Sequence, residues 1–293
     1  MGWRNCTLLG GLFCVVGGGS ALATDLSNSL TGSVSDGTGT LPYRLFEPTG
    51  LADGQKAPLV LFLHGMNDRG TDDVAQTNWM GGLVNATKSG QYASYVLAPQ
   101  IDTHSWFQSF SSTPTEAMKL TIQALKSVID TENVDTSRVY VTGLSMGGMG
   151  TWDILAREPK LFAAAVPMSG GGDVKTAATI KDIPIWAFHG GADSIVPVSA
   201  TRDMIQALKD AGGDPKYTEI AGADHAIWGP IYADANDTLY PWLFSQHLGS
   251  ATTVDTTGAT VVAPTPEPGS ITLLTIAGVT LLGRRRRWRC GSR

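Results

Sequence analysis

A serine bounded by glycines is the residue of this chain with the clearest chemical potential. Ser145 lies in Gly-Leu-Ser-Met-Gly, residues 143–147, directly after the apolar run 138–142. A β-branched run, a tight glycine turn and a segment that can be helical are the context of a nucleophile elbow, in which larger side chains would clash. The pattern predicts a serine hydroxyl beside a helix N-terminus, where developing negative charge is stabilised.

An acid and a histidine follow the serine in the order that such a site requires. Asp193 lies in a glycine-rich loop after the apolar run 185–189, and His225 follows the strand-like run 216–220. In a parallel sheet, both loops are expected on the same edge as the serine turn. Asp193 would then fix the imidazole tautomer, His225 would accept the proton of Ser145, and the serine would attack a carbonyl carbon. The alternative is a glycine-rich loop that merely contains a serine.

Other carboxylates compete with Asp193 for the role of the acid. Asp173 and Asp182 lie in neighbouring segments, and Asp224 directly precedes His225. Because adjacent side chains point apart, we expect the side chain of Asp224 to face away from the imidazole. Asp193 itself could also be a loop-capping aspartate without a chemical role, so its assignment depends on its place in the order.

The predicted elements alternate between strands and helices, which favours a mostly parallel α/β sheet. An antiparallel hairpin over 32–48 is expected at the sheet edge. Further strands are predicted at 59–63, 95–98, 139–142, 162–167, 183–188 and 217–220, and helices at 115–132, 146–157, 197–211 and 238–247.

Four segments together resemble the α/β-hydrolase superfamily, namely 58–65, 143–148, 186–193 and 222–225. The closer resemblance is to the branch of secreted esterases and predicted peptidases that also holds feruloyl esterases, acetyl-xylan esterases and polyhydroxyalkanoate depolymerases. It covers roughly residues 32–248. It implies an α/β-hydrolase fold, with a mostly parallel central sheet flanked by helices and no large lid. These motifs are specific for catalytic class and weakly specific for substrate, because one fold hosts many chemistries.

The resemblance also implies an oxyanion hole and a substrate pocket. The backbone N–H of Met146 would be one donor, because this residue follows the nucleophile, and Met66 matches the family position of the other. Trp106 and Trp228 follow predicted strand ends or site loops, where they would line an acyl or sugar pocket. Packing beneath a loop is the alternative for each tryptophan.

Two further histidines, His64 and His189, each end an apolar run and precede a glycine. We expect both to shape loops rather than to act as a base. The five histidines of the chain lack metal-ligand spacing relative to one another, so neither a metal nor a cofactor is expected.

The cysteines and charges of the chain limit its chemistry and its partners. The three cysteines, Cys6, Cys14 and Cys290, lie outside the predicted catalytic domain, which excludes a thiol nucleophile and separates the chain from dienelactone hydrolases with cysteine at the elbow. All 26 acidic residues lie between Asp25 and Glu267, whereas seven of the 21 basic residues lie near the termini. This acidic middle argues against nucleic acid as a partner, since phosphate binding needs basic surface.

Both ends of the chain are typical of targeting segments. Residues 1–23 have one early arginine, an apolar stretch and a terminal Ala-Leu-Ala, which predicts a signal peptide. Residues 24–249 would form the catalytic domain and 250–265 a linker. Residues 266–293 contain Pro-Glu-Pro, a short apolar run and an arginine cluster, and resemble the Pro-Glu-Pro sorting signal that exosortases process. A plain membrane anchor is the alternative.

The targeting segments imply secretion, or retention at the surface or envelope of a Gram-negative-type bacterium. The tail would contact the membrane and a sorting enzyme transiently. These features favour a secreted serine carboxylic-ester hydrolase that works through an acyl-enzyme, on small or polymer-linked esters such as acylated polysaccharide. A serine peptidase and a polyester depolymerase with the same triad stay open as alternatives, as does a non-catalytic surface-binding protein on the same fold.

Overall fold

The computed structural model describes residues 24–88, 90–102, 105–106, 112–234 and 237–249. The predicted signal peptide, linker and sorting tail therefore lie outside the described residues. Within these residues, no helix is both long enough and apolar enough to cross a membrane.

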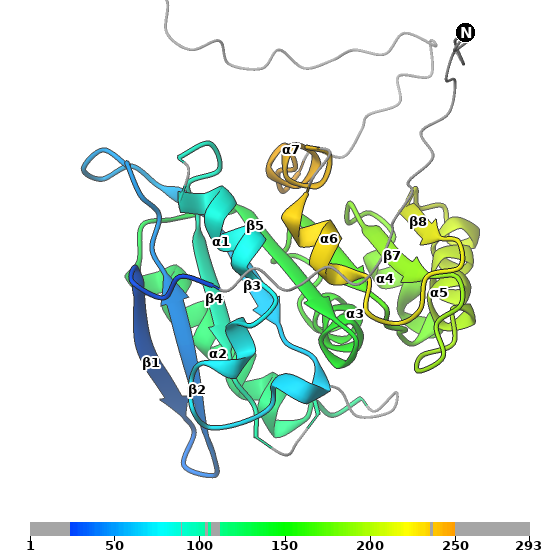
Figure 1. Cartoon of the computed structure of the whole chain (residues 1–293), viewed down its shortest axis with the longest axis horizontal. Coiled ribbons are helices and arrows are strands. Elements are labelled where there is room, and N and C mark those ends of the chain that lie inside the picture. Colours follow the sequence, from blue (N-terminus) through cyan, green and yellow to red (C-terminus); the bar gives the residue numbers. More distant parts are fainter. Residues whose placement is uncertain (1–23, 89, 103–104, 107–111, 235–236, 250–293) are drawn as a thin grey trace, which may run out of the picture. The chain divides into compact units, whose positions relative to one another are not determined.

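Eight strands form one mixed sheet in the order β1-β2-β4-β3-β5-β6-β7-β8, from left to right in Figure 1. β1 (Ser29–Ser35) and β2 (Thr40–Phe46) pair antiparallel, as predicted for the edge hairpin, and β2 is antiparallel to β4. The other pairs are all parallel. The strands that make them are β3 (Ala57–Leu63), β4 (Tyr95–Pro99), β5 (Val134–Leu144), β6 (Ala164–Met168), β7 (Trp186–Gly190) and β8 (Lys216–Ile220).

The strands β3, β4 and β6 are buried along their whole length and largely apolar, because both faces of the sheet are covered. In β3, Leu59, Leu61 and Leu63 belong to one buried cluster, whereas Val60 and Phe62 belong to a second. This alternation follows from the two-residue period of a strand. Every residue of β3 is buried, which explains its unbroken hydrophobic run.

The helices divide between the two buried clusters. The first cluster includes side chains of α2 (Glu116–Thr131), α3 (Met146–Arg157), α4 (Ala177–Ile180) and α5 (Ser199–Asp210). The second includes side chains of α1 (Gly81–Lys88), α6 (Trp228–Ala233) and α7 (Leu239–Phe244). Three short 3-10 turns complete the described elements, η1 (Met66–Asp68), η2 (Ala75–Thr77) and η3 (Val174–Thr176).

The sequence predicts the long helices better than the short ones. The predicted helix at 115–132 is α2, in which Thr115 caps the N-terminus by accepting a hydrogen bond from the Met118 amide at 3.0 Å. The predicted helix at 146–157 is α3, with the same bounds. The predicted helix at 238–247 ends earlier, at Phe244, and the six-residue α6 was not predicted, because such short helices depend on tertiary packing.

The carboxyl ends of the parallel strands bring the candidate residues to one edge of the sheet. His64 follows β3, Ser145 follows β5, Asp193 lies in the loop after β7, and His225 lies in the loop after β8. Open α/β sheets bind their ligands at this edge.

Candidate active site

Ser145 occupies a strained turn between β5 and α3. Its φ of 55° and ψ of −118° lie where L-residues rarely occur, and its amide donates to the Met168 carbonyl at 2.9 Å. Only glycine fits at two positions of this turn, because neighbouring backbone atoms leave no room for a Cβ. A Cβ on Gly143 would overlap the Gly147 carbonyl, and a Cβ on Gly147 would overlap the Leu63 carbonyl. The turn therefore has the conformation predicted for a nucleophile elbow.

The structure brings Ser145, His225 and Asp193 into one hydrogen-bonded chain. Ser145 Oγ lies 2.8 Å from His225 Nε2, and His225 Nδ1 lies 2.7 Å from Asp193 Oδ2. Because a carboxylate only accepts hydrogen bonds, Nδ1 bears the proton and Nε2 is free to accept the hydroxyl of Ser145. The imidazole is 15% exposed and the carboxylate is fully buried.

The carboxylate of Asp193 has further partners that hold it in place. Oδ1 accepts the amides of Ile195 at 2.9 Å and Val196 at 2.8 Å. Oδ2 lies 3.1 Å from Nε2 of the buried His189, in addition to its contact with His225. Asp193 is thus both the loop cap and the partner of His225, two roles that the sequence left as alternatives.

The rival carboxylates have other partners. Asp173 accepts the Lys175 amide at the start of η3, and Asp182 pairs with Lys181. Asp224 faces away from the imidazole, as predicted. Its Oδ1 accepts the Ser194 amide and the His225 amide, each at 2.8 Å, and hydrogen bonds from Ser194 lower the pKa of its carboxyl. Asp224 therefore ties the loop of the acid to the loop of the histidine.

Sequence reasoning missed Ser169, which supports the loop of His225 from β6. Its hydroxyl donates to the His225 carbonyl at 2.9 Å, and its own backbone has a φ of 45°. Ser169 is fully buried. The Ser-Gly-Gly sequence directly after an apolar strand was the available signal, since such a sequence marks a tight turn at a strand end.

Two backbone amides near Ser145 in the chain or fold are candidates for binding an oxyanion. Met146 is the first residue of α3 and Met66 the first of η1, and neither amide donates to another described residue. The side chain of Met66 is 55% exposed, so its expected contribution is that of the backbone. These are the amides that the resemblance assigns to an oxyanion hole.

His64 orients the peptide that carries the Met66 amide. Its Nδ1 donates to the Gly65 carbonyl at 2.7 Å, and its Nε2 accepts from the Ile101 amide at 3.1 Å. In a trans peptide the C=O and N–H groups point in opposite directions, so fixing the Gly65 carbonyl also fixes the direction of the Met66 N–H. Burial lowers the pKa of His64 to about 4, which keeps the ring neutral.

The structure corrects the prediction for Trp106 and qualifies that for Trp228. Trp106 is fully buried, and its Nε1 donates to the His64 carbonyl at 2.9 Å, so it supports a loop and does not line an open pocket. Trp228 lies edge-on to the imidazole of His225, with ring centroids 5.3 Å apart. Its side chain is 7% exposed and also contacts Trp79, which places it at the site but mostly beneath its surface.

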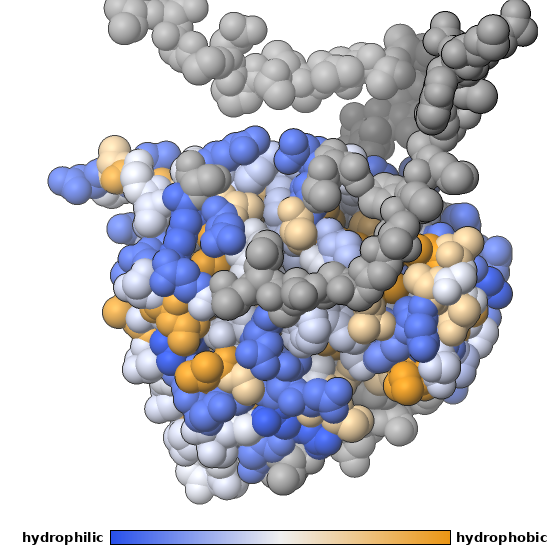
Figure 2. Space-filling view, viewed as in Figure 1, coloured by the Kyte–Doolittle hydropathy of each residue, from blue (hydrophilic) through white to orange (hydrophobic). Residues whose placement is uncertain are grey.

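Hydrophobic residues on the face seen in Figure 2 are scattered among hydrophilic ones. Two of the exposed large hydrophobic residues come from loops of the site. Met66 follows β3, and Ile195, which is 69% exposed, follows Asp193. The loops around Ser145 thus offer apolar contact area to a bound molecule. Among the described residues, no group of three His, Cys, Asp or Glu side chains is arranged to hold a metal.

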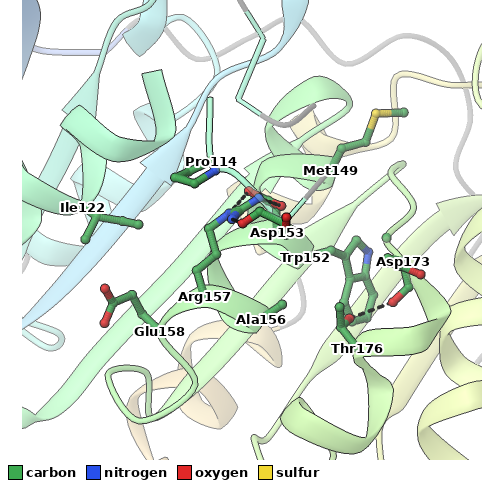
Figure 3. A pocket seen from close by; sticks show the side chains of 12 residues that line it. Pro114, Ile122, Met149, Trp152, Asp153, Ala156, Arg157, Glu158, Asp173 and Thr176 are labelled. Carbon is green, nitrogen blue, oxygen red and sulfur yellow. Dashed lines mark hydrogen bonds and ion pairs between the residues drawn. The ribbon is translucent and has the colours of Figure 1, made fainter. Parts of the chain in front are cut away.

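A cavity of about 600 Å³ lies between α2, α3 and η3 (Figure 3). Its described lining residues do not include those of the hydrogen-bonded chain. In Figure 3 the guanidinium of Arg157 lies against the carboxylate of Asp153, with Nε 2.7 Å from Oδ2. These two charges therefore satisfy each other.

Comparisons with known proteins place this geometry in context. The sequence profile of the dienelactone hydrolase family matches residues 89–236, a range that contains Ser145, Asp193 and His225. A bifunctional acetylxylan esterase/xylanase of Neocallimastix patriciarum is 26% identical over 68% of this chain and 27% of its own length. A poly(3-hydroxyalkanoate) depolymerase of Paucimonas lemoignei is 26% identical over 80% of this chain and 64% of its own length.

The structural comparison agrees with the sequence matches. A thermostable esterase superposes with a TM-score of 0.70 and 38% identity, over 76% of this chain and 64% of the esterase. The fold is therefore an α/β-hydrolase fold, as predicted. The chain spans less than two thirds of the length of each of these three relatives.

Proposed function

Since the chain belongs to the dienelactone hydrolase family, we propose that it is a serine carboxylic-ester hydrolase with Ser145, His225 and Asp193 as its catalytic triad. The observation that carries the proposal is the continuous hydrogen-bonded chain from Asp193 Oδ2 through the imidazole to Ser145 Oγ. The chain belongs to this family without a cysteine in its catalytic domain, so it differs from those members that use cysteine at the elbow.

The geometry supports an acyl-enzyme mechanism. Ser145 Oγ attacks the ester carbonyl carbon while His225 Nε2 takes its proton, and Asp193 stabilises the imidazolium that forms. The Met66 and Met146 amides receive the negative charge on the carbonyl oxygen. The imidazolium then protonates the leaving alcohol. A water molecule, deprotonated by the same imidazole, releases the acid and regenerates the serine.

Ester substrates, small or polymer-linked, are the class that the comparisons favour. An acetylxylan esterase and a thermostable esterase are among the relatives, which supports acylated polysaccharide as one such substrate. A polyester is the second candidate. The similarity to a poly(3-hydroxyalkanoate) depolymerase over 80% of this chain and the exposed Met66 and Ile195 favour it, because apolar side chains would contact an apolar polymer surface.

Replacement of the nucleophile tests the proposal. Ser145→Ala should lower ester hydrolysis by about 10³-fold or more while leaving the fold intact. Ser199→Ala, at an exposed position at the start of α5, is the matched control and should retain full activity. Hydrolysis of p-nitrophenyl, feruloyl and acetyl-sugar esters, a polyester film and a casein peptide gives the readout. Parent-like ester turnover by folded Ser145→Ala would exclude Ser145, and cleavage of casein alone would indicate a peptidase.

Export and tail processing form a separate proposal. The signal-like segment 1–23 and the Pro-Glu-Pro tail 266–293 support secretion with retention at the envelope, through transient contact with the membrane and a sorting enzyme. Mass spectrometry of the protein from its native host is the test. The expected mature form lacks both 1–23 and the arginine cluster. A form that keeps the cluster would indicate a plain anchor, and one that keeps Met1 would contradict export.

A further inference from the structure

His189 is a fully buried histidine that the proposed mechanism does not use. It lies in β7, next to the loop that carries Asp193. Its Nδ1 lies 2.7 Å from the Thr201 hydroxyl, and its Nε2 lies 3.0 Å from the Val196 carbonyl and 3.1 Å from Asp193 Oδ2. The partners of both ring nitrogens are therefore defined, and they determine where the ring carries its protons.

The Thr201 hydroxyl has only one proton, and it donates this proton to an acceptor other than His189. Thr201 Oγ1 donates to the Gly170 carbonyl at 2.6 Å, and a carbonyl can only accept. The hydroxyl must therefore accept a hydrogen bond from His189, so Nδ1 carries a proton. On the other side of the ring, a carbonyl and a carboxylate both require a donor. Nε2 must carry a proton as well.

We infer that His189 is an imidazolium, with a proton on each ring nitrogen, that acts as a positioning residue behind the catalytic carboxylate. A buried charge needs a nearby charge of opposite sign. The carboxylate of Asp193 provides it, because Oδ2 lies 3.1 Å from Nε2 of His189. The inference rests on the proposed triad for its consequence in catalysis. The protonation state itself follows from the hydrogen bonds alone.

Other charged groups near His189 are paired among themselves. Glu219 is its neighbour in β8 and forms an ion pair with Arg202 of α5 at 2.6 Å. Asp224, in the loop after β8, accepts hydrogen bonds from Ser194 and the His225 amide. His225 shares Oδ2 of Asp193 with His189. Asp193 is therefore the carboxylate in direct contact with the imidazolium.

This arrangement has two effects on the triad. The imidazolium holds the carboxylate of Asp193 in place, so His225 keeps the tautomer with its proton on Nδ1. It also offsets part of the negative charge that His225 experiences, which makes protonation of His225 less favourable. The second effect extends the activity of Ser145 toward lower pH, because a protonated His225 cannot accept the serine proton.

Nuclear magnetic resonance of the full chain with ¹⁵N-labelled histidine tests the protonation state directly. The His189 signals are assigned by their loss in His189→Gln. Both ring nitrogens should carry protons at pH 7. A spectrum with one protonated and one bare ring nitrogen at neutral pH would overturn the inference. This readout is independent of ester hydrolysis, so it stands apart from the test of the proposed function.

The pH profile of kcat/KM tests the effect on catalysis. In His189→Gln, which removes the charge but retains a donor, the midpoint of the acid limb should rise by about one pH unit. Thr201→Ser retains the hydroxyl partner and should leave the midpoint unchanged. A uniform loss of kcat without a shift of the midpoint would mean that His189 acts through packing only. If His189→Gln does not fold, the His189 signals are assigned by elimination, from the signals lost in single substitutions of the other four histidines, and the parent spectra then decide the protonation state.

Discussion

His64 and His189 occupy equivalent places in two halves of the sheet and have different chemistry. Each ends a buried strand, precedes a glycine and is fully buried. The ring of His64 meets one acceptor, the Gly65 carbonyl, and one donor, the Ile101 amide, so it is neutral. The ring of His189 meets acceptors on both sides. Burial disfavours the charged form of both rings, and the hydrogen-bond partners of the ring nitrogens then distinguish the two histidines.

The two histidines support opposite sides of the candidate site. His64 orients the peptide that carries the Met66 amide, where negative charge would develop. His189 contacts the carboxylate of Asp193 on the opposite side. The neutral ring of His64 thus orients an amide that would bind an oxyanion. The cation of His189 lies beside a carboxylate, where a positive charge is stabilised. Substitutions on each side of the site test these two roles separately.

The largest effect is expected on the side of the acid. Asp193→Asn should lower kcat by about 10⁴-fold, because the amide would favour the wrong tautomer of His225. Asp224→Asn is the matched control and should cost far less, since its side chain contacts Ser194 and the His225 amide rather than the ring. Ester-hydrolysis kinetics of both variants give the measurement. The reverse ranking would transfer the role of the acid to Asp224.

On the other side, His64→Leu should lower kcat by about 10²-fold, the cost of one misdirected oxyanion donor. His64→Gln retains a donor and an acceptor and should recover part of the loss. His247→Leu, at an exposed position, should have no effect. If His64→Leu retained parent kcat in the folded state, the carbonyl contact of His64 would not control the Met66 amide.

Acid should destabilise the protein through His64. Its pKa is lowered from 6.5 to about 4 by burial, so the unfolded chain binds the additional proton first as pH falls. Above pH 6.5, the neutral ring of His64 makes its full contribution to the free energy of unfolding. This contribution decreases as the pH falls and is lost by pH 4, which lowers the free energy of unfolding by about 3 kcal/mol. Urea titrations of parent and His64→Gln at pH 7 and pH 4 measure it. A difference in unfolding free energy that does not change with pH would contradict the neutral ring.

The smallest expected effect is a difference in stability between substitutions of Trp106 and Trp228. Trp106→Phe removes the donor to the buried His64 carbonyl and should cost about 1–3 kcal/mol of stability. Trp228→Phe should cost less, because Trp228 Nε1 is buried without a partner among the described residues. Thermal or urea unfolding of the two variants makes the comparison. Equal costs would mean that ring volume, and not the hydrogen bond, decides both values.

The sequence specified the candidate site well where local patterns determine it. The glycine turn around Ser145 and the order of the three residues predicted a chain that the structure assembles within hydrogen-bond distance. The charge of His189 and the burial of Trp106 could not be predicted. They depend on contacts with Thr201, Gly170 and the His64 carbonyl, which only the folded chain brings together.

The crowding of the serine turn has a consequence for directed evolution of this protein. A single methyl group at Gly143 or Gly147 would collide with backbone, so libraries that vary these positions would consist mainly of inactive members. Met66 and Ile195 carry exposed side chains on the loops that follow β3 and β7. Diversity introduced at these two positions would sample new substrate preferences while preserving the chemistry of the turn.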